Sequence, residues 1–178
     1  MSTTNYLFAG FGGQGILFSG KVLAYKGLMD GKNVSWLPSY GPEMRGGTAN
    51  CSVIISDTPV GSPIVSKPDV LIAMNLPSLD AFENSVKEGG MIFVDSTLIE
   101  RKVNRTDVKV FYIPVTKLAS DNNITKLANM IMVGKILKET NEFNDEESVT
   151  NALKQVISAK HSDMLEVNLN AMRLGRDF

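Results

Sequence analysis

A glycine-rich segment near the N-terminus, Gly10–Gly15, has the spacing G-x-G-x-x-G of an anion-binding turn between a strand and a helix. It follows the apolar run Tyr6–Ala9 and leads into a segment with helical spacing, from about Gln14 to Met29. Glycine permits positive φ in a tight turn and lets a phosphate approach the backbone closely. N–H groups at the helix start, together with the helix dipole, favour negative charge. Two interpretations fit this spacing: a loop that binds an anion, and a tight strand–helix turn without a ligand.

The two best-known nucleotide sites do not match this loop. A dinucleotide site needs an acid at the tip of the second strand, but the second apolar run, Val34–Leu37, is followed by Pro38–Gly41, which contains none. A P-loop needs a lysine and then a serine or threonine where Ile16 and Leu17 stand. The loop therefore supports neither NAD nor ATP as its ligand.

A second segment whose side chains could bind a ligand, Ser39–Gly47, is dense in turn-forming residues. In an open α/β sheet, ligand crevices lie outside the carboxyl ends of the strands, so we expect this segment to stand beside the glycine loop. Arg45 offers a planar fork for phosphate or carboxylate, and Tyr40 offers a stacking face and a hydroxyl. Glu43 could accept a hydrogen bond or pair with Arg45. The alternative is a solvated turn with a surface ion pair.

Composition excludes several classes of function. With 178 residues, a net charge of -1 and no run of Lys or Arg, the chain is not built to bind nucleic acid or an anionic membrane. No stretch approaches the roughly 20 apolar residues of a membrane span. The single cysteine, Cys51, and the single histidine, His161, exclude an internal disulfide, a cysteine-ligated iron–sulfur cluster and a His-rich metal site within this chain. Without a signal-like N-terminus, we expect a cytoplasmic protein.

Strands that alternate with helices predict a single α/β domain over residues 1–178, with a mostly parallel sheet. Alternating apolar residues predict a strand over 48–56, which should pair with a returning strand over 60–65 as an antiparallel edge hairpin. Cys51 should point inward from that strand. Thr125 is expected to cap a helix that runs to about Thr140, and Asp95 to cap a turn or contact a ligand. The remaining elements are expected as buried strands over 70–74 and 91–94, a strand over 108–113, and helices over 77–87, 115–120, from Asn144 or Asp145, and within 162–178.

The chain resembles the gamma subunit of the 2-oxoacid:ferredoxin oxidoreductases. The glycine loop and the Ser39–Gly47 segment together carry most of this resemblance, and the second is the more specific of the two. Further matching segments are Lys67–Asn75, Asn129–Gly134 and Asn168–Gly175. These segments extend over nearly the whole chain in the family's order.

The resemblance implies a Rossmann-like three-layer sandwich that works only within a complex. Such enzymes oxidatively decarboxylate a 2-oxoacid with coenzyme A, yielding acyl-CoA, carbon dioxide and reduced ferredoxin. By this resemblance, the chain alone binds no cofactor, and coenzyme A is its expected shared ligand. Thiamine diphosphate, magnesium and iron–sulfur clusters belong to alpha-, beta- and delta-type partner subunits, and ferredoxin accepts the electrons. The resemblance favours 2-oxoglutarate and branched-chain 2-oxoacids over pyruvate as the substrate.

The resemblance also assigns a ligand- or subunit-contact region, with no catalytic residue and no metal ligand. Its residues are Gly10, Gly12, Gly13, Gln14, Gly15, Tyr40, Gly41, Glu43, Arg45 and Gly46. We expect the glycine loop to meet a phosphate of coenzyme A or to shape the route to the thiamine site. Two alternatives remain: a purely structural assembly subunit, and a free Rossmann-type nucleotide-binding enzyme.

Overall fold

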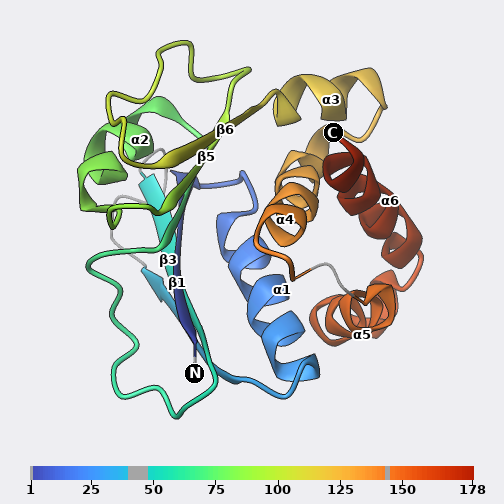
Figure 1. Cartoon of the computed structure of the whole chain (residues 1–178). Coiled ribbons are helices and arrows are strands. Elements are labelled where there is room, and N and C mark those ends of the chain that lie inside the picture. The colour runs from blue at the N-terminus through green and yellow to red at the C-terminus, as the bar shows by residue number, and fades with distance from the viewer. Residues whose placement is uncertain (1, 40–47, 143–144) are drawn as a thin grey trace.

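Six strands form one sheet in the order β2-β3-β1-β4-β5-β6 in the computed structural model, which describes residues 2–39, 48–142 and 145–178 (Figure 1). β4, β5 and β6 follow β1 in parallel, whereas β3 runs antiparallel to both β1 and β2. The mostly parallel α/β architecture expected from the sequence is thus confirmed. The strands are β1 Thr3–Phe11, β2 Asn33–Ser39, β3 Thr48–Ser56, β4 Val70–Ala73, β5 Met91–Asp95 and β6 Lys109–Ile113.

The antiparallel edge hairpin exists, but its strands are β2 and β3 rather than β3 and residues 60–65. β3 is inserted between β1 and β2, and residues 60–65 form no strand. The expected partner strand contains Gly61 and Pro63, and a proline cannot donate to a strand ladder. β3 instead pairs along its full length with β1, from Thr48 opposite Phe11 to Ser56 opposite Thr3.

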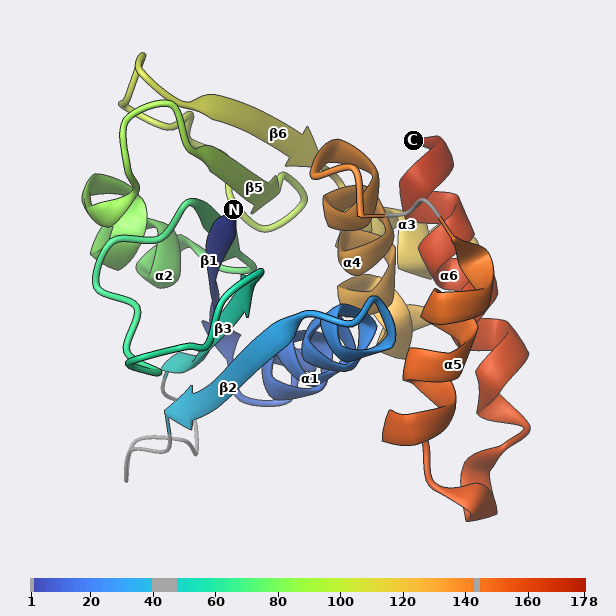
Figure 2. The same ribbon diagram turned by 60° about the horizontal axis from the view of Figure 1, so that its bottom comes forward.

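Helices cover both faces of the sheet, but unequally (Figure 1 and Figure 2). On one face, α1 and α4 pack on Tyr6, Phe8 and Ile72; on the other, α2 covers Leu7 and Leu71. The helices α5 and α6 pack against α1 and α4 as an outer layer that the three-layer expectation did not include. The helices are α1 Ile16–Met29, α2 Leu76–Phe82, α3 Val115–Asp121, α4 Ala128–Glu139, α5 Glu146–Val156 and α6 Met164–Asp177, with short 3-10 turns η1 Glu83–Ser85, η2 Thr125–Leu127 and η3 Ala159–His161.

Small residues let α1 lie directly on the hairpin. A Cβ on Gly20 would stand 2.3 Å from the Cys51 sulfur, and one on Gly27 would stand 3.0 Å from Val34. Cys51 is buried as expected, and its Sγ donates to the Ile16 carbonyl at 3.6 Å. Burial raises the pKa of the Cys51 thiol to about 12, so this group behaves as a small core residue rather than as a thiolate nucleophile.

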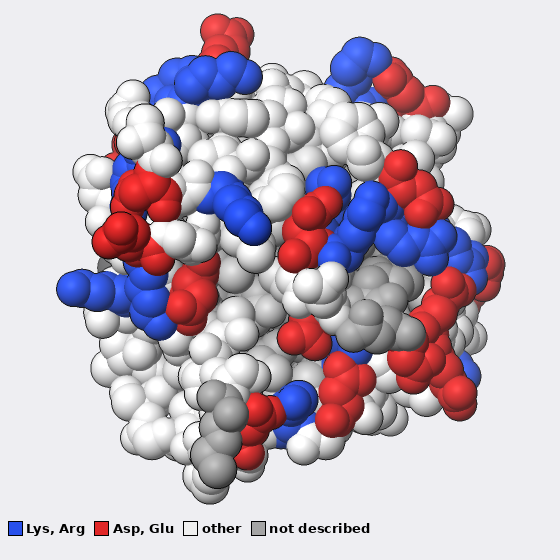
Figure 3. All heavy atoms as spheres, viewed as in Figure 1, with Lys and Arg blue, Asp and Glu red and all other residues white. Residues whose placement is uncertain are grey.

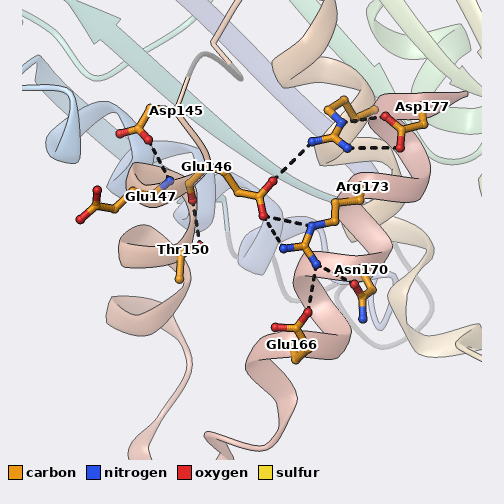
Figure 4. Close-up of polar contacts among 9 residues, drawn as sticks. Asp145, Glu146, Glu147, Thr150, Glu166, Asn170, Arg173 and Asp177 are labelled. Atoms are coloured by element: carbon orange, nitrogen blue, oxygen red, sulfur yellow. Dashed lines mark hydrogen bonds and ion pairs between the residues drawn. The ribbon is translucent and has the colours of Figure 1, made fainter.

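The two helices of the outer layer are held by an N-terminal cap on α5 and by a network of charges between α5 and α6 (Figure 4). Asp145 caps α5, because its carboxylate accepts from the N–H groups of Glu147 and Ser148 at 2.9 and 3.2 Å. Arg173 of α6 contacts Glu146 of α5, with its Nε 3.0 Å from Oε1. Hydrogen bonds from Arg173 lower the pKa of Glu146. Such partly exposed pairs orient the two helices more than they stabilise them.

Backbone contact between α4 and α6 closes this layer. A Cβ on Gly134 would lie 1.9 Å from the Met172 carbonyl oxygen, and a Cβ on Gly175 would lie 1.8 Å from that of Ile131. Only glycine therefore fits at this crossing. On the face shown in Figure 3, Lys and Arg side chains lie beside Asp and Glu side chains and do not gather by sign.

The lowered pKa of Asp57, just after β3, predicts how the stability of the fold depends on pH. Hydrogen bonds from the Lys32 ammonium, at 2.5 Å, and from the Ser2 N–H, at 2.7 Å, lower the pKa of Asp57 to about 2. A carboxyl with a depressed folded pKa stabilises the fold when ionised, so its contribution is complete above about pH 4 and is lost as the pH falls towards 2. We expect Asp57→Asn to flatten the loss of stability between pH 4 and 2, as measured by urea midpoints.

A substitution of Lys32, the partner of Asp57, tests the same explanation of the acid dependence. Lys32→Met should flatten the same part of the pH profile, because the ammonium is the main cause of the depressed pKa. Wild-type slopes in both variants would contradict the assignment of this acid dependence to the Asp57 carboxylate.

Candidate functional site

The glycine loop lies at the carboxyl ends of β1 and β4, where the chain diverges to opposite faces of the sheet. β1 continues into α1 on one face, and β4 continues into α2 on the other (Figure 1). The Met74 N–H donates to the Ala9 carbonyl at 2.9 Å, so the two strand ends remain joined up to this point. A divergence of this kind is the usual place for a ligand crevice in an open α/β sheet.

The backbone of the loop needs its glycines. Gly13 and Gly15 have φ of 91° and 74°, in the left-handed region that side chains disfavour. Gly10 allows close approach instead: a Cβ there would stand 2.6 Å from the Gln14 side-chain oxygen and 2.7 Å from Ile16. The first bond of α1 joins Ser19 N to Gly15 O at 2.9 Å, so the N–H groups of residues 16–18 precede the helical ladder.

Gln14 fixes the shape of this loop. Its Oε1 accepts from the Phe11 N–H at 2.7 Å, and its Nε2 donates to the Met74 carbonyl at 3.0 Å. Its own backbone N–H donates to the Phe11 carbonyl at 3.2 Å. Both polar atoms of the side chain are thus engaged within the protein, and the loop is tied to the end of β4.

Asn129, at the start of α4, holds the other end of the loop. Its Nδ2 donates to the Gly15 carbonyl and to the Ser19 hydroxyl oxygen, each at 3.2 Å. The Ser19 hydroxyl donates in turn to the Gly15 carbonyl at 2.9 Å. From the sequence, Asn129 was expected only as the first residue of a segment that matches the family, and its place at the loop was missed. No local signal identifies it, because its partner Gly15 lies 114 residues away.

Two cavities meet at this loop. One, of about 220 Å³, is lined by Gly13, Gln14 and Met74, and the other, of about 450 Å³, by Gly15 and Phe18. Both are also lined by Asn129 and by Lys126. Lys126 is exposed and forms no ion pair within the described part of the chain, so its ammonium is available to an anion at the loop.

The structure brings together one half of the expected site. Gly10, Gly12, Gly13, Gln14 and Gly15 lie in one turn. The other half, namely Tyr40, Gly41, Glu43, Arg45 and Gly46, lies outside the described residues. β2 ends at Ser39 at the same edge of the sheet as the glycine loop, and β3 begins at Thr48, opposite Phe11. That the two segments share one site stays a prediction.

Asp95 has a structural role. It is fully buried, and its carboxylate accepts from the Thr97 N–H at 3.1 Å and from the Thr116 hydroxyl at 2.5 Å. It therefore caps the turn, the first of the two roles that the sequence allowed. Within residues 2–39, 48–142 and 145–178, no three His, Cys, Asp or Glu side chains gather as a group that could hold a metal ion. None of the helices in these ranges is both long and apolar enough to cross a membrane.

An open, mostly parallel α/β sheet, with a glycine loop between strand and helix at the divergence of its connections, defines a Rossmann-like domain. The chain belongs to the pyruvate ferredoxin/flavodoxin oxidoreductase family, because the model of that family matches residues 5–178. This match confirms the resemblance found in the sequence.

Relatives of known class agree with the family. The chain is 38% identical over 170 residues to the ketoisovalerate oxidoreductase subunit VorA of Methanothermobacter marburgensis, a match that covers 96% of this chain and 35% of VorA. It therefore spans about a third of that relative. It is 36% identical over 176 residues to the 2-oxoglutarate synthase subunit KorC of Methanothermobacter thermautotrophicus, covering 95% of this chain and 91% of KorC.

Solved structures place the domain within the family. The gamma subunit of a keto/oxoacid ferredoxin oxidoreductase from Geobacter sulfurreducens superposes with a TM-score of 0.85 at 27% identity, over 99% of this chain and 96% of that one. A 2-oxoglutarate:ferredoxin oxidoreductase from Magnetococcus marinus, with 2-oxoglutarate, coenzyme A and succinyl-CoA bound, has the same TM-score at 23% identity, over 99% of this chain and 31% of that one. The second likeness shows the fold alone. The chain is of the gamma-subunit type.

Proposed function

We propose that this chain serves in a multi-subunit 2-oxoacid:ferredoxin oxidoreductase of the cytoplasm. The complex would convert a 2-oxoacid and coenzyme A to acyl-CoA and carbon dioxide, and would pass the electrons to ferredoxin. The names of the two relatives support ketoisovalerate and 2-oxoglutarate as substrates. Thiamine diphosphate, magnesium and iron–sulfur clusters would lie on alpha-, beta- and delta-type partners. This chain would contribute binding surface rather than chemistry.

The observation that carries the proposal is the geometry of the glycine loop. The left-handed backbone at Gly13 and Gly15 turns the chain so that N–H groups of residues 16–18 stand at the start of α1. The exposed ammonium of Lys126 lines both cavities at the loop. Backbone donors, a helix N-terminus and a lysine are the partners that a phosphate needs. These residues therefore fit the phosphate of a ligand such as coenzyme A.

In this proposal, some residues would bind the phosphate and others would support the loop. The N–H groups of residues 16–18 and the ammonium of Lys126 would hold a phosphate, and Arg45 would add a guanidinium contact. Gln14 and Asn129 would keep the loop in shape, since both of their amide groups are hydrogen-bonded to it. Coenzyme A, when bound, supplies the thiol that accepts the acyl group. Proton and electron transfer would remain with partner-borne cofactors.

Lysine and arginine substitutions test the phosphate contact. We expect Lys126→Met and Arg45→Ala, each in the assembled complex, to raise the KM for coenzyme A about tenfold, because one charge-assisted hydrogen bond is lost. The KM for the 2-oxoacid should not change, since that substrate would bind on the partner subunits. Steady-state kinetics with each substrate varied in turn give both constants.

A matched control is available on the opposite edge of the sheet. Lys109→Met removes an exposed lysine at the start of β6, which is an edge strand of the sheet. This substitution should leave both KM values unchanged. An unaltered KM for coenzyme A in both the Lys126 and the Arg45 variants would remove the loop from the coenzyme site and favour the structural alternative.

A purely structural role is the second candidate, and one observation favours it. Phe11 ends β1, and Leu76 and Leu98 follow the ends of β4 and β5. They are 40, 40 and 45% exposed, so exposed apolar residues stand at the carboxyl ends of the strands, where the glycine loop lies. Exposed apolar residues at one edge suit contact with another protein. Leu76→Asp should then prevent co-purification with the partner subunits. Normal assembly with a raised KM for coenzyme A would instead support the ligand-contact role.

A free nucleotide-binding enzyme has no such support. β2 ends at Ser39 without an acidic residue at its tip, where a dinucleotide site would need one. A thermal-shift screen with NAD, NADP and FAD would test this alternative directly.

A further inference from the structure

The larger of the two cavities at the glycine loop has a mostly apolar lining that solvent can reach. Its volume is about 450 Å³, and it lies where the starts of α1 and α4 meet the segment that joins α5 to α6. Its apolar side chains come from α1, η2, the end of α5 and the start of α6, namely Phe18, Leu127, Val156, Ile157 and Met164. Met164 is 37% exposed, and Phe18 and Val156 are only partly buried. An apolar body that covered these side chains would therefore gain free energy from the water it displaced.

Three exposed polar side chains line the same cavity, those of Lys126, Ser158 and His161. None of the three forms a side-chain hydrogen bond or an ion pair with another residue in the described part of the chain. The His161 N–H donates to the Ser158 carbonyl at 2.9 Å, so one tight turn carries both residues. An ammonium, a hydroxyl and an imidazole can each donate a hydrogen bond, and the imidazole does so in its neutral form as well as in its protonated form. The cavity therefore offers three accessible donors.

The rest of the polar lining adds no charge. Asn129 and Asn168 are buried, and their Nδ2 atoms already donate to backbone carbonyls at 3.2 and 2.8 Å. No carboxylate lines the cavity, so the ammonium of Lys126 gives the lining a positive charge. A cation would be repelled there, whereas an anion with a single charge would be neutralised. A carboxylate fits this lining, since it carries one charge and its two oxygens accept from several donors.

We propose that this cavity binds a monocarboxylate with an apolar tail, of the class of short fatty acids. The carboxylate accepts from the ammonium of Lys126 and from the donors of the turn that carries Ser158 and His161. The tail packs on the apolar side chains of α1, α5 and α6 that line the cavity. The inference does not depend on the proposed function, because it uses neither coenzyme A nor partner subunits. Lys126 takes part in both, so a bound monocarboxylate would compete with a phosphate at the glycine loop.

The test compares three probes on the full 178-residue chain. Hexanoate has both the charge and the tail, hexanamide has the tail without the charge, and acetate has the charge with almost no tail. We expect the Kd of hexanoate to be at least about tenfold lower than that of either control, because each control lacks one of the two contacts. NMR titrations measure the three Kd values. Since His161 is the single histidine of the chain, its ring signals show whether hexanoate binds at this cavity. Equal affinity for hexanoate and either control, no binding of hexanoate, or unshifted His161 signals would overturn the proposal.

One variant isolates the contribution of the charge. Lys126→Met should weaken hexanoate binding about tenfold and leave hexanamide binding unchanged, because only hexanoate pairs with the ammonium. Lys160→Met is the matched control, since Lys160 is an exposed lysine of η3 that does not line the cavity, and it should leave both affinities unchanged. Wild-type hexanoate affinity in the Lys126 variant, or an equal loss in the Lys160 variant, contradicts the proposal.

The outcomes for this cavity and for the proposed function can be told apart. Binding of hexanoate is measured on the isolated chain, whereas the contact with coenzyme A is measured as a KM of the assembled complex. A chain that does not bind hexanoate, in a complex whose KM for coenzyme A still rises in Lys126→Met, would overturn this inference alone. Selective binding of hexanoate, with an unaltered KM for coenzyme A, would overturn only the proposed phosphate contact.

Discussion

Replacing Gly134 with alanine is expected to lower the free energy of unfolding by about 3 kcal/mol, at the upper end of the cost of overpacking. The added Cβ would lie 1.9 Å from the Met172 carbonyl oxygen, so α4 and α6 would have to separate. A backbone carbonyl cannot rotate away as a side-chain tip could. Urea unfolding followed by far-UV circular dichroism measures the loss, and Gly175→Ala should produce a similar one because its Cβ would meet the Ile131 carbonyl oxygen.

Gly61 provides the matched control for this crossing. Its added Cβ would meet nothing within 4 Å, and its φ does not lie in the left-handed region. Gly61→Ala should therefore change the free energy of unfolding by no more than about 0.5 kcal/mol. Equal losses in the Gly61 and Gly134 variants would show that the helix crossing does not cause the effect.

Arg101→Met is expected to cost about 2 kcal/mol, because it leaves a buried carboxylate without its cation. The Glu83 side chain is 6% exposed, and its oxygens accept from the Arg101 guanidinium at 3.1 and 3.2 Å. Breaking a buried pair typically costs more, but the Arg101 side chain is 29% exposed and Asn104 still donates to Glu83. Chemical denaturation of the variant measures the loss.

A second substitution should restore most of this loss. In Arg101→Met with Glu83→Met, neither charge of this pair remains, so the double variant should be more stable than Arg101→Met alone. Lys117→Met serves as the exposed control, since Lys117 and Asp121 are 64 and 53% exposed and such a pair contributes little. A double variant no more stable than the single one would contradict this account of Glu83.

Local patterns predicted most elements of the fold. The continuous apolar runs at β4 and β5 fit strands that are buried on both faces. The place of β3 could not be predicted, because alternation looks the same whether a strand has one neighbour or two. Thr125 was wrongly expected to cap a long helix: it begins a 3-10 turn, and α4 starts at Ala128 with no side-chain cap.

The turn of the glycine loop was predicted because it is local in sequence, and the distant residues that hold it were missed. The spacing of Gly10–Gly15 identified the loop, since strand, turn and helix follow one another directly. That Gln14 joins the loop to Met74, 60 residues later, depends on the pairing of β1 with β4. The role of Asn129 depends on α4 packing beside α1. Contacts of this range are set by the tertiary fold rather than by local spacing.

The hydrogen bond from Gln14 to Met74 would couple binding of a ligand at the glycine loop to binding of a partner subunit in the proposed complex. Met74 lies two residues before Leu76, the first residue of α2, which is 40% exposed. A partner that shifts the backbone at Leu76 would also move the carbonyl from which the loop is held, and so redirect the N–H groups offered to a ligand. Thermodynamic linkage requires the reverse as well: a ligand that tightens the loop would change the affinity of the chain for its partner by the same factor.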